Sequence, residues 1–490
     1  MILLNLYTFL LTLLCLALAP LLPLLLLVPR TRWGLGMRLG ILPKAVREQA
    51  WLSEGSIWVH AASLGEVNAV APVLRELAPK LPRQALVITC TTQAGCQQAK
   101  RLFPQASACL LLPIDLPWLL APWIRRFKPR LLVLAETELW PNLLTQMKAH
   151  GAQILVANGR LTERSLRRYR RLGRSFAALL EAIDLFAMQA EADAQRIQAL
   201  GARPARVSVA GNTKFDLGLD PEAARIDAAQ LRRGLGWAAG APVLVAGSTR
   251  PGEEAALLAA FAKLQKQLPT ARLVLAPRHL ERRAEVEALL KKGRWNWVRR
   301  SQPGPAQDAD VLLLDTLGEL RLFYGLAFDG GAAWIGGSFR DFGGQNPLEA
   351  SALGVPVFFG PSMRHFPDVA QALLDCGAAR QVAEGELAEA TLALLKDGKA
   401  RRAAAEAGEA CVRARAGAGR RTAELALKLL LVARMHREGN AWRGEGLEQF
   451  RKVTEFGTAG DPHGWDQGDD GGVAIAREFG TMHEDGDGLG

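Results

Sequence analysis

The apolar residues of the chain follow two alternating patterns over most of its length. Between residues 55 and 215, short continuous apolar runs alternate with segments in which apolar residues recur every three or four positions. Such alternation predicts a parallel sheet covered by helices on both faces. The runs that we predict to be strands are Ile57–Ala61, Leu86–Thr91, Leu131–Ala135, Ile154–Ala157, Leu185–Met188 and Val207–Ala210.

An acidic segment that contains proline interrupts this pattern between Asp216 and Ala228, and a second series of strands follows it. The predicted strands of this series are Val243–Gly247, Leu273–Ala276, Val311–Leu314, Ala332–Gly336 and Val355–Phe359. Helical sequence rich in Ala and Leu then extends from about residue 386 to 436. We therefore predict an α/β protein with two doubly wound, Rossmann-like domains, residues 30–220 and 221–440, that face a ligand-binding cleft.

The amino-terminal residues 1–29 contain no charged side chain and are rich in Leu, which predicts a membrane anchor. At a rise of ~1.5 Å per residue, about 20 such residues cross a hydrocarbon core of roughly 30 Å. Arg30, Arg32 and Arg38 follow, and basic residues that flank a span stay in the cytoplasm. We expect one transmembrane helix with the body of the protein on the cytoplasmic side. Pro20 and Pro23 leave a monotopic or hairpin insertion open as the alternative.

Charge is distributed unevenly along the chain. Its 490 residues carry a formal net charge of +11, although residues 441–490 are rich in Gly and Asp, and we predict disorder from about residue 453. The rest of the chain is therefore strongly basic, which favours anionic lipid or anionic substrates, with a solvated helix face as the alternative. The basic residues expected near lipid are Arg30, Arg32, Arg125, Arg126, Arg164, Arg167, Arg168 and Arg171.

Several common signatures are missing from the sequence. Basic and aromatic residues are not interleaved as in proteins that bind single-stranded nucleic acid. Neither a Walker A motif nor a GxGxxG motif after the first strand is present. The cysteines and histidines show no metal-ligand spacing, and Asp308-Ala-Asp310 precedes a strand, so we interpret it as a solvated turn. We expect no nucleic-acid partner, no cofactor and no metal.

Three polar clusters follow predicted strands of the first domain: Ser63–Glu66, Glu136–Asn142 and Gly211–Asp216. Glu66 starts a helix, where it either acts on a ligand or only interacts with the helix dipole. Helix capping by Thr137 would explain one of the two acids that flank it and not the other. Lys214 either offsets negative charge near the cleft or pairs with Asp216.

Four loops of the second domain follow predicted strands and are rich in glycine or basic residues: Gly247–Glu254, Ala276–Arg283, Thr316–Glu319 and Gly336–Ala350. The last has paired glycines and then Asn346-Pro347, which we expect to start a helix with Glu349 one turn in. Free N–H groups at a helix start suit a phosphate, and a nearby acid can accept hydrogen bonds from ribose. Each loop alone is common, but four on one edge indicate a nucleotide site.

Seven of these motifs, in this order, resemble those of the 3-deoxy-D-manno-octulosonic acid (Kdo) transferases of lipopolysaccharide synthesis. The motifs are Ser63-Leu-Gly-Glu66, Glu136-Thr-Glu-Leu-Trp-Pro-Asn142, Gly211-Asn-Thr-Lys-Phe-Asp216, Gly247-Ser-Thr, Pro277-Arg-His, Gly318-Glu-Leu and Gly343-Gly-Gln-Asn-Pro-Leu-Glu349. The resemblance implies a GT-B fold, CMP-Kdo as the donor, and a lipid A precursor (lipid IVA) as the acceptor. It also implies a location at the inner leaflet of a bacterial inner membrane.

The resemblance implies roles for individual residues. Glu66 would be the catalytic base, and Glu136 and Lys214 would stabilise the transition state of an inverting transfer. The sequence departs from the family at Gln345 and Arg250, where the family often has His. The CMP pocket would be lined by Pro277, Arg278, Leu317, Gly318, Glu319, Asn346, Pro347, Leu348 and Glu349.

Two other classes of function compete with this interpretation. One is a GT-B enzyme that uses a UDP-sugar, or an epimerase of the same fold. The other is a non-catalytic, membrane-tethered protein that binds a nucleotide sugar. Competition between CMP-Kdo and UDP-sugars tests the first alternative. Replacement of Glu66 by Gln tests the second, because an enzyme loses turnover and a binding protein does not.

Overall fold

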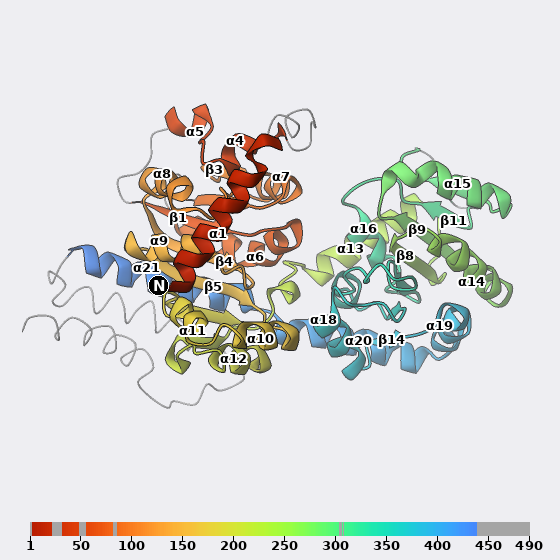
Figure 1. Ribbon diagram of the computed structural model, residues 1–490. Coiled ribbons are helices and arrows are strands. Elements are labelled where there is room, and N and C mark those ends of the chain that lie inside the picture. Colours follow the sequence, from red (N-terminus) through yellow and green to blue (C-terminus); the bar gives the residue numbers. More distant parts are fainter. Residues whose placement is uncertain are drawn as a thin grey trace, which may run out of the picture. The chain divides into compact units, whose positions relative to one another are not determined.

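The computed structural model describes residues 2–21, 32–48, 55–81, 86–302, 306 and 308–438. Arg30 and the predicted acidic tail, residues 441–490, lie outside these ranges. The contacts within the chain divide it into two compact units (Figure 1). Unit 1 contains the chain up to Asp216 together with the residues from Gly417 onward, and unit 2 contains Leu217–Ala416.

Unit 1 is built on a seven-stranded parallel sheet with the order β3-β2-β1-β4-β5-β6-β7. The central strands are continuous apolar runs because helices bury both of their faces, as predicted. The short edge strand β3 was not predicted. The strands are β1 (Ser56–His60), β2 (Leu86–Cys90), β3 (Ala108–Leu111), β4 (Pro129–Ala135), β5 (Gln153–Gly159), β6 (Leu185–Met188) and β7 (Val207–Val209).

Two hydrophobic cores cover the faces of this sheet. Trp58 of β1 packs on one face with side chains of α8, α9, α11 and α12. Val59, the next residue, packs on the other face with side chains of α6, α7 and α21. The helices of unit 1 after the amino-terminal segment are α4 (Leu35–Arg38), α5 (Lys44–Glu48), α6 (Leu64–Leu77), α7 (Gln93–Leu102), α8 (Pro117–Phe127), α9 (Pro141–Ala149), α10 (Glu163–Arg170), α11 (Arg174–Leu180), α12 (Glu191–Gln198) and α21 (Ala418–Glu438).

The last helix belongs to unit 1, whereas the sequence pattern predicts that residues up to 440 belong to the second domain. Ala423, Ala426 and Leu429 of α21 are buried in the same core as α6. Helical periodicity predicted the helix correctly, but it does not identify the surface on which an apolar face packs. The Asp216 carboxylate accepts hydrogen bonds from the backbone N–H groups of Gly417 and Gly419, which fastens the start of α21 to unit 1.

Unit 2 has its own seven-stranded parallel sheet, in the order β10-β11-β9-β8-β12-β13-β14. Leu244, Phe261 and Trp334 lie in its core. The five predicted strands are present, and the two edge strands, β10 and β14, were not predicted. The strands are β8 (Val243–Thr249), β9 (Arg272–Pro277), β10 (Trp297–Arg299), β11 (Val311–Leu313), β12 (Ala332–Ile335), β13 (Val357–Phe359) and β14 (Ala379–Gln381).

Helices surround the sheet of unit 2. The predicted connection between Asp216 and Ala228 is mostly helical, because the Asp220 side chain accepts hydrogen bonds from Glu222 N and Ala223 N and so caps α13. The helices are α13 (Pro221–Gly234), α14 (Glu253–Gln267), α15 (Arg283–Lys292), α16 (Leu320–Gly325), α17 (Leu348–Ala352), α18 (Pro367–Asp375), α19 (Leu387–Lys396) and α20 (Gly398–Arg415).

The amino-terminal segment forms α1 (Ile2–Leu18), continued by a 3-10 turn (Ala19–Leu21). Leu3–Leu21 is long and apolar enough to cross a membrane, with a mean hydropathy of 2.0, and no other described helix has this property. α1 contacts α9 of unit 1 (Figure 1).

Candidate active site

Glu66 lies in the first turn of α6, just after β1, at the carboxyl end of the sheet of unit 1. Ser63 is the N-cap of α6, and its hydroxyl accepts a hydrogen bond from Glu66 N at 3.3 Å. The same hydroxyl donates to Glu66 Oε1 at 2.9 Å, and Ala62 N donates to Oε2 at 2.7 Å. These contacts hold the carboxylate in one orientation at the strand end.

The environment of Glu66 raises its pKa from 4.5 to about 7. Burial is the main cause, and the negative charges of Glu138 and Glu136 add to it, whereas the hydrogen bonds from Ala62 and Ser63 oppose it. An acid that only interacted with the helix dipole would have a lowered pKa. A carboxyl group with a pKa near neutrality is suited to take up and release a proton.

Glu136 and Lys214 come from different loops of the same sheet edge. Glu136 follows β4 with a φ of 55°, a left-handed conformation that is uncommon for a residue with a side chain. Its Oε1 lies 3.8 Å from Lys214 Nζ, and both side chains are partly exposed. Lys214 therefore lies beside a negative charge of the acidic motif, and Asp216 accepts hydrogen bonds from Gly417 N and Gly419 N.

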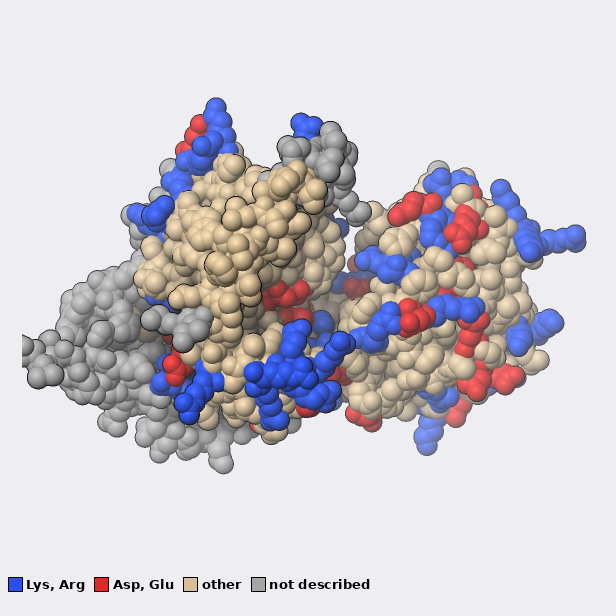
Figure 2. All heavy atoms as spheres, viewed as in Figure 1, with Lys and Arg blue, Asp and Glu red and all other residues tan. Residues whose placement is uncertain are grey.

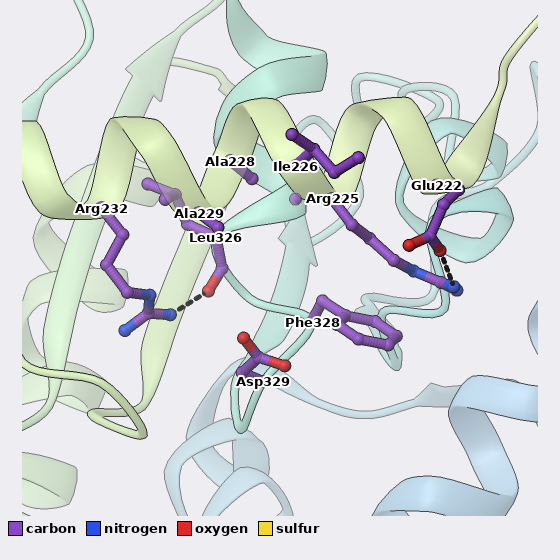
Figure 3. Close-up of a pocket in the computed structure, with 10 residues that line it drawn as sticks. Glu222, Arg225, Ile226, Ala228, Ala229, Arg232, Leu326, Phe328 and Asp329 are labelled. Carbon is purple, nitrogen blue, oxygen red and sulfur yellow. Dashed lines mark hydrogen bonds and ion pairs between the residues drawn. The ribbon is translucent and has the colours of Figure 1, made fainter.

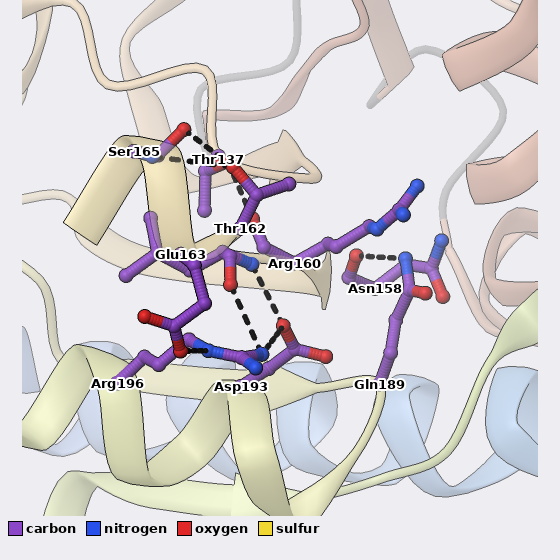
Figure 4. A network of polar contacts seen from close by, with 10 residues as sticks. Thr137, Asn158, Arg160, Thr162, Glu163, Ser165, Gln189, Asp193 and Arg196 are labelled. Carbon is purple, nitrogen blue, oxygen red and sulfur yellow. Dashed lines mark hydrogen bonds and ion pairs between the residues drawn. The ribbon is translucent and has the colours of Figure 1, made fainter. Parts of the chain in front are cut away.

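The segment Glu136–Trp140, which we call the acid loop, joins β4 to α9. The interpretation of Thr137 as the cap of the following helix is wrong, because α9 begins at Pro141. The Thr137 hydroxyl instead donates to Arg160 O at 2.8 Å and fixes the loop to the end of β5 (Figure 4). Glu138 is therefore not a first-turn acid, and burial raises its pKa, as does the charge of Glu136.

A buried network positions the residue next to Lys214. Thr213 N donates to Asn158 Oδ1 at 3.0 Å, and the Thr213 hydroxyl donates to Ala69 O of α6 at 2.6 Å. Asn158 has a φ of 55° at the end of β5, and its carbonyl accepts a hydrogen bond from Gln189 (Figure 4). Lys214 is thus tied to the helix that carries Glu66. Sequence reasoning considered Glu138 only as an acid of a helix start, and it missed Asn158, although an Asn at the end of an apolar strand was a visible signal.

His60 is not part of this chemistry. It is fully buried in β1, and burial lowers its pKa to about 4. Its Nδ1 lies 3.1 Å from the Thr89 hydroxyl. The residue is therefore a neutral core histidine.

In unit 2, one buried carboxylate joins two of the predicted loops. Glu253, at the start of α14, accepts hydrogen bonds from Arg250 N at 2.8 Å, Gly337 N at 2.7 Å and Phe339 N at 3.0 Å. A charged acceptor shared by three N–H groups makes strong hydrogen bonds. The loop after β8 and the glycine-rich loop after β12 are therefore held together.

The predicted residues Pro277 and Arg278 lie at the end of β9, where basic side chains gather. Arg278 is exposed, and its backbone N donates to Thr249 O at 3.0 Å. Arg250 Nη1 lies 2.6 Å from His279 Nε2, and burial together with the positive charge of Arg278 lowers the pKa of Arg250. This concentration of positive charge favours an anionic ligand.

The two remaining predicted loops are brought together by α16 and α17, which pack on one another. Leu317 is 79% exposed, and Arg300 lowers the pKa of Glu319 through hydrogen bonds of 2.7 and 3.1 Å. Arg321 of α16 lies 3.8 Å from Glu349 of α17. A helix does follow Asn346-Pro347 as predicted, but α17 begins at Leu348, and Asn346 Oδ1 accepts a hydrogen bond from Leu348 N at 3.1 Å.

A cavity of about 330 Å³ lies elsewhere in unit 2, between α13 and the end of α16 (Figure 3). Its arginines are paired within the protein: Arg225 contacts Glu222 and Glu409, and Arg232 donates to three backbone carbonyl groups. None of the predicted site residues lines it. Its charged side chains therefore serve the packing of α13.

Among the residues that the structure describes, no group of three or more His, Cys, Asp or Glu side chains could hold a metal ion. The expectation of a reaction without metal or cofactor stays a prediction. The carboxylates and the lysine of unit 1 are the groups available for acid–base chemistry at its strand ends.

Comparison with known proteins identifies the family. A family model described as 3-deoxy-D-manno-octulosonic-acid transferase (kdotransferase) matches residues 34–217. The Kdo transferase of Haemophilus influenzae is 33% identical over 373 residues, which are 75% of this chain and 86% of the relative. The chain belongs to the Kdo transferase family. The Kdo transferase of Bordetella pertussis is 37% identical over 382 residues, 75% of this chain and 85% of the relative.

Solved structures confirm the predicted GT-B type of α/β fold. A UDP-GlcNAc 2-epimerase from Neisseria meningitidis, solved with UDP-GlcNAc, matches 77% of this chain and 99% of its own with a TM-score of 0.51. Its sequence identity is 15%, so the likeness concerns the fold alone. Family membership makes this protein a glycosyltransferase that transfers Kdo.

Proposed function

We propose that this Kdo transferase moves Kdo from CMP-Kdo to a lipid A precursor, lipid IVA, with inversion at the anomeric carbon, in lipopolysaccharide synthesis. The observation that carries the proposal is Glu66, a carboxyl group with a pKa of about 7, held at a strand end in the same electrostatic environment as Glu136. Membership of the family indicates that the transferred sugar is Kdo, and Glu66 provides a group that can accept a proton.

In this mechanism Glu66 takes the proton from an acceptor hydroxyl. The hydroxyl oxygen attacks the anomeric carbon of Kdo from the face opposite CMP, the bond to the phosphate oxygen breaks, and CMP leaves with the electron pair. A base in hydrogen-bond reach contributes roughly 10²–10⁴-fold to the rate. The Glu136 carboxylate would stabilise the positive charge of an oxocarbenium-like transition state. Lys214, whose Nζ lies 3.8 Å from Glu136 Oε1, would also help to stabilise the transition state.

The donor would bind to unit 2. Pro277 and Arg278, Leu317–Glu319 and Asn346–Glu349 would line the CMP pocket. In support, Arg278 is an exposed cation that can meet the phosphate charge as CMP leaves, and Glu253 holds the neighbouring glycine-rich loop in place. Glu319 and Glu349 are each paired with an arginine, which fixes the acceptors available to ribose hydroxyls.

The acceptor would be reached at the cytoplasmic face of the inner membrane. α1 offers an apolar surface for attachment. Figure 2 shows basic side chains gathered over α10. The surface of α1, which carries no charge, is visible from the same side of unit 1. The exposed arginines of this region are Arg164, Arg167, Arg168, Arg170, Arg171 and Arg174. Such a surface attracts anionic lipid and the phosphates of a lipid A precursor.

The test is the Glu66→Gln variant, assayed with CMP-Kdo and lipid IVA by the mass of the product. We expect turnover to fall by at least 100-fold and CMP affinity to stay unchanged. Unchanged turnover would contradict the role of Glu66. A wild-type enzyme that uses UDP-sugars in preference to CMP-Kdo would contradict the donor.

Folding of this variant is checked by thermal unfolding. Because the folded state raises the pKa of Glu66, this residue contributes stability that is complete below pH 4.5 and lost as the pH rises through about 7. Glutamine removes that loss, so Glu66→Gln should be at least as stable as wild type at pH 8. A lower stability at pH 8 would mean that misfolding explains the lost activity.

A further inference from the structure

The polar and apolar residues of α1 lie on different faces of the helix. Its partly buried positions recur every three or four residues, and they include the side chains that carry hydroxyl or thiol groups, Tyr7, Thr8, Thr12 and Cys15. The exposed face is apolar apart from Asn5. The large side chains on it are Leu6, Phe9, Leu10, Leu13, Leu14, Leu16 and Leu18, each 47–64% exposed.

The polar face of α1 makes a specific contact with α9. Thr8 Oγ1 lies 3.0 Å from Asn142 Oδ1 and 2.9 Å from the carbonyl oxygen of Leu4, so its proton is shared between two acceptors. Asn142 is 3% exposed, and its side-chain amide donates to Asp115 O at 2.7 Å. The amide is thereby oriented with its oxygen toward α1.

Asp115 completes the contact. This residue is 2% exposed, and its carboxylate accepts hydrogen bonds from Asn142 N at 3.0 Å and Leu143 N at 2.8 Å. It satisfies two of the free N–H groups at the start of α9. Tyr7 of α1 also hydrogen-bonds to this carboxyl group. Two adjacent residues of α1 therefore contact the pair of side chains that holds the first turn of α9.

The acid loop, which carries Glu136 and Glu138, ends at Trp140, directly before this first turn. The other end of the loop is fixed by Glu136 N, which donates to Ala157 O of β5 at 2.9 Å. A loop of five residues between two fixed points has few conformations. Release of one end would let both acids move.

We propose that α1 is a structural part of the catalytic unit: it docks lengthwise through Tyr7 and Thr8 on Asp115 and Asn142, and so positions the acid loop. Its opposite apolar face remains for the lipid bilayer. This inference rests on the proposed function of Glu66 and Glu136, and it favours insertion of α1 along the membrane, the alternative left open by Pro20 and Pro23, over a single span.

The kinetic test compares Thr8→Val, Thr8→Ser and Thr12→Val in the full chain, reconstituted in lipid vesicles. Thr12 is the matched control, because its hydroxyl donates to Thr8 O within the helix. We expect Thr8→Val to lower kcat about 10-fold with the donor KM and the membrane-bound fraction unchanged. Thr8→Ser should keep the wild-type rate. A Thr8→Val enzyme as active as Thr12→Val would overturn the proposal.

The pH profile adds a readout that a merely structural role would not change. Glu136 and Glu138 both raise the pKa of Glu66, whereas Ala62 and Ser63 lower it. A displaced acid loop leaves Glu66 with less negative charge nearby. The acid limb of kcat/KM should therefore move to lower pH in Thr8→Val, and an unmoved limb would count against the proposal.

Amide hydrogen exchange tests the docking without any activity. The N–H groups of Asn142 and Leu143 should exchange at least several-fold faster in Thr8→Val than in Thr12→Val, and equal rates would overturn the docking. If wild type transfers no Kdo, the proposed function fails while the exchange experiment still reports on α1. Replacing residues 2–21 by an unrelated apolar spanning helix should restore membrane binding but not kcat, and full activity of this chimera would also refute the proposal.

Discussion

At the scale of single residues, the state of Glu66 depends on several opposing contacts. Hydrogen bonds from Ala62 and Ser63 stabilise the carboxylate, while burial and the negative charges of Glu138 and Glu136 destabilise it. The result is a pKa of about 7 instead of 4.5. The sequence could place Glu66 at a helix start from local pattern alone. It could not give the protonation state, because burial, the main cause of the raised pKa, and the charges of a loop about 70 residues away both arise only in the folded chain.

The first prediction concerns the pH dependence of the reaction. If Glu66 is the base, kcat/KM rises with pH and levels off above about 7, because only the carboxylate accepts a proton. Glu138→Gln removes one negative charge near Glu66, so its pKa falls and the acid limb moves down by roughly half a unit to one unit. Steady-state kinetics from pH 5 to 9 checks this.

The control for this prediction is Glu181→Gln, which removes an exposed acid of the same unit. Its profile should match wild type. A Glu138→Gln profile that coincides with wild type would show that the charge of Glu138 does not act on Glu66 in the working enzyme.

At the scale of elements, sequence patterns predicted the interior of each unit better than its borders. The inner strands, including the short β11 and β13, are continuous apolar runs that are buried, and all were predicted. β3, β10 and β14 are three or four residues long and carry partly exposed positions, so their pattern is weak. The acid loop was misread at Thr137 because its hydroxyl bonds to Arg160, a partner that local sequence does not reveal.

The second prediction concerns the glycine-rich loop after β12. Gly343 has a φ of 85°, and a Cβ there would lie 2.6 Å from the ring of His365. Gly343→Ala should therefore weaken donor binding at least 10-fold, and lower the free energy of unfolding by roughly 1–3 kcal/mol. Calorimetric titration with CMP and thermal unfolding measure the two effects.

A matched variant distinguishes the effect of backbone strain from that of the steric contact with His365. Gly377 has a similar φ of 76° with no atom within 4 Å of a built Cβ. Gly377→Ala should cost the backbone strain of about 1 kcal/mol and leave CMP affinity intact. Equal CMP affinity in both variants would mean that the loop at Gly343 does not shape the donor site.

At the scale of the whole chain, the last helix lies in the first unit and not in the second, and the sequence could not show this. The chain leaves unit 1 after Asp216, builds unit 2, and comes back at Gly417 to add α21 to the first unit. The two predicted domains were recovered from alternating patterns. The return was missed because the Ala- and Leu-rich face of α21 fits either unit by periodicity, and only packing with α6 decides.

The third prediction concerns the hydrogen bonds that hold the start of α21 on unit 1. Asp216 is half-buried, and its carboxylate accepts hydrogen bonds from Gly417 N and Gly419 N. Asp216→Ala leaves these N–H groups without that acceptor, which should lower the free energy of unfolding by roughly 1–3 kcal/mol and expose the start of α21. Limited proteolysis should then cut the variant around residues 416–420 faster than wild type.

Asp227→Ala, which removes an exposed acid of α13, is the control, and it should be cut at the wild-type rate. The site of cleavage decides the interpretation. If Asp216→Ala is less stable but is cut first within α13 or α20, the carboxylate stabilises the protein without holding the return. If cleavage around 416–420 accelerates while Glu66 keeps its pH profile, α21 is fastened at Asp216 independently of the acid–base group.

Gly419 adds to this expectation, because a Cβ at its position would lie 2.7 Å from Pro72 of α6. The start of α21 therefore approaches that helix too closely for any larger residue.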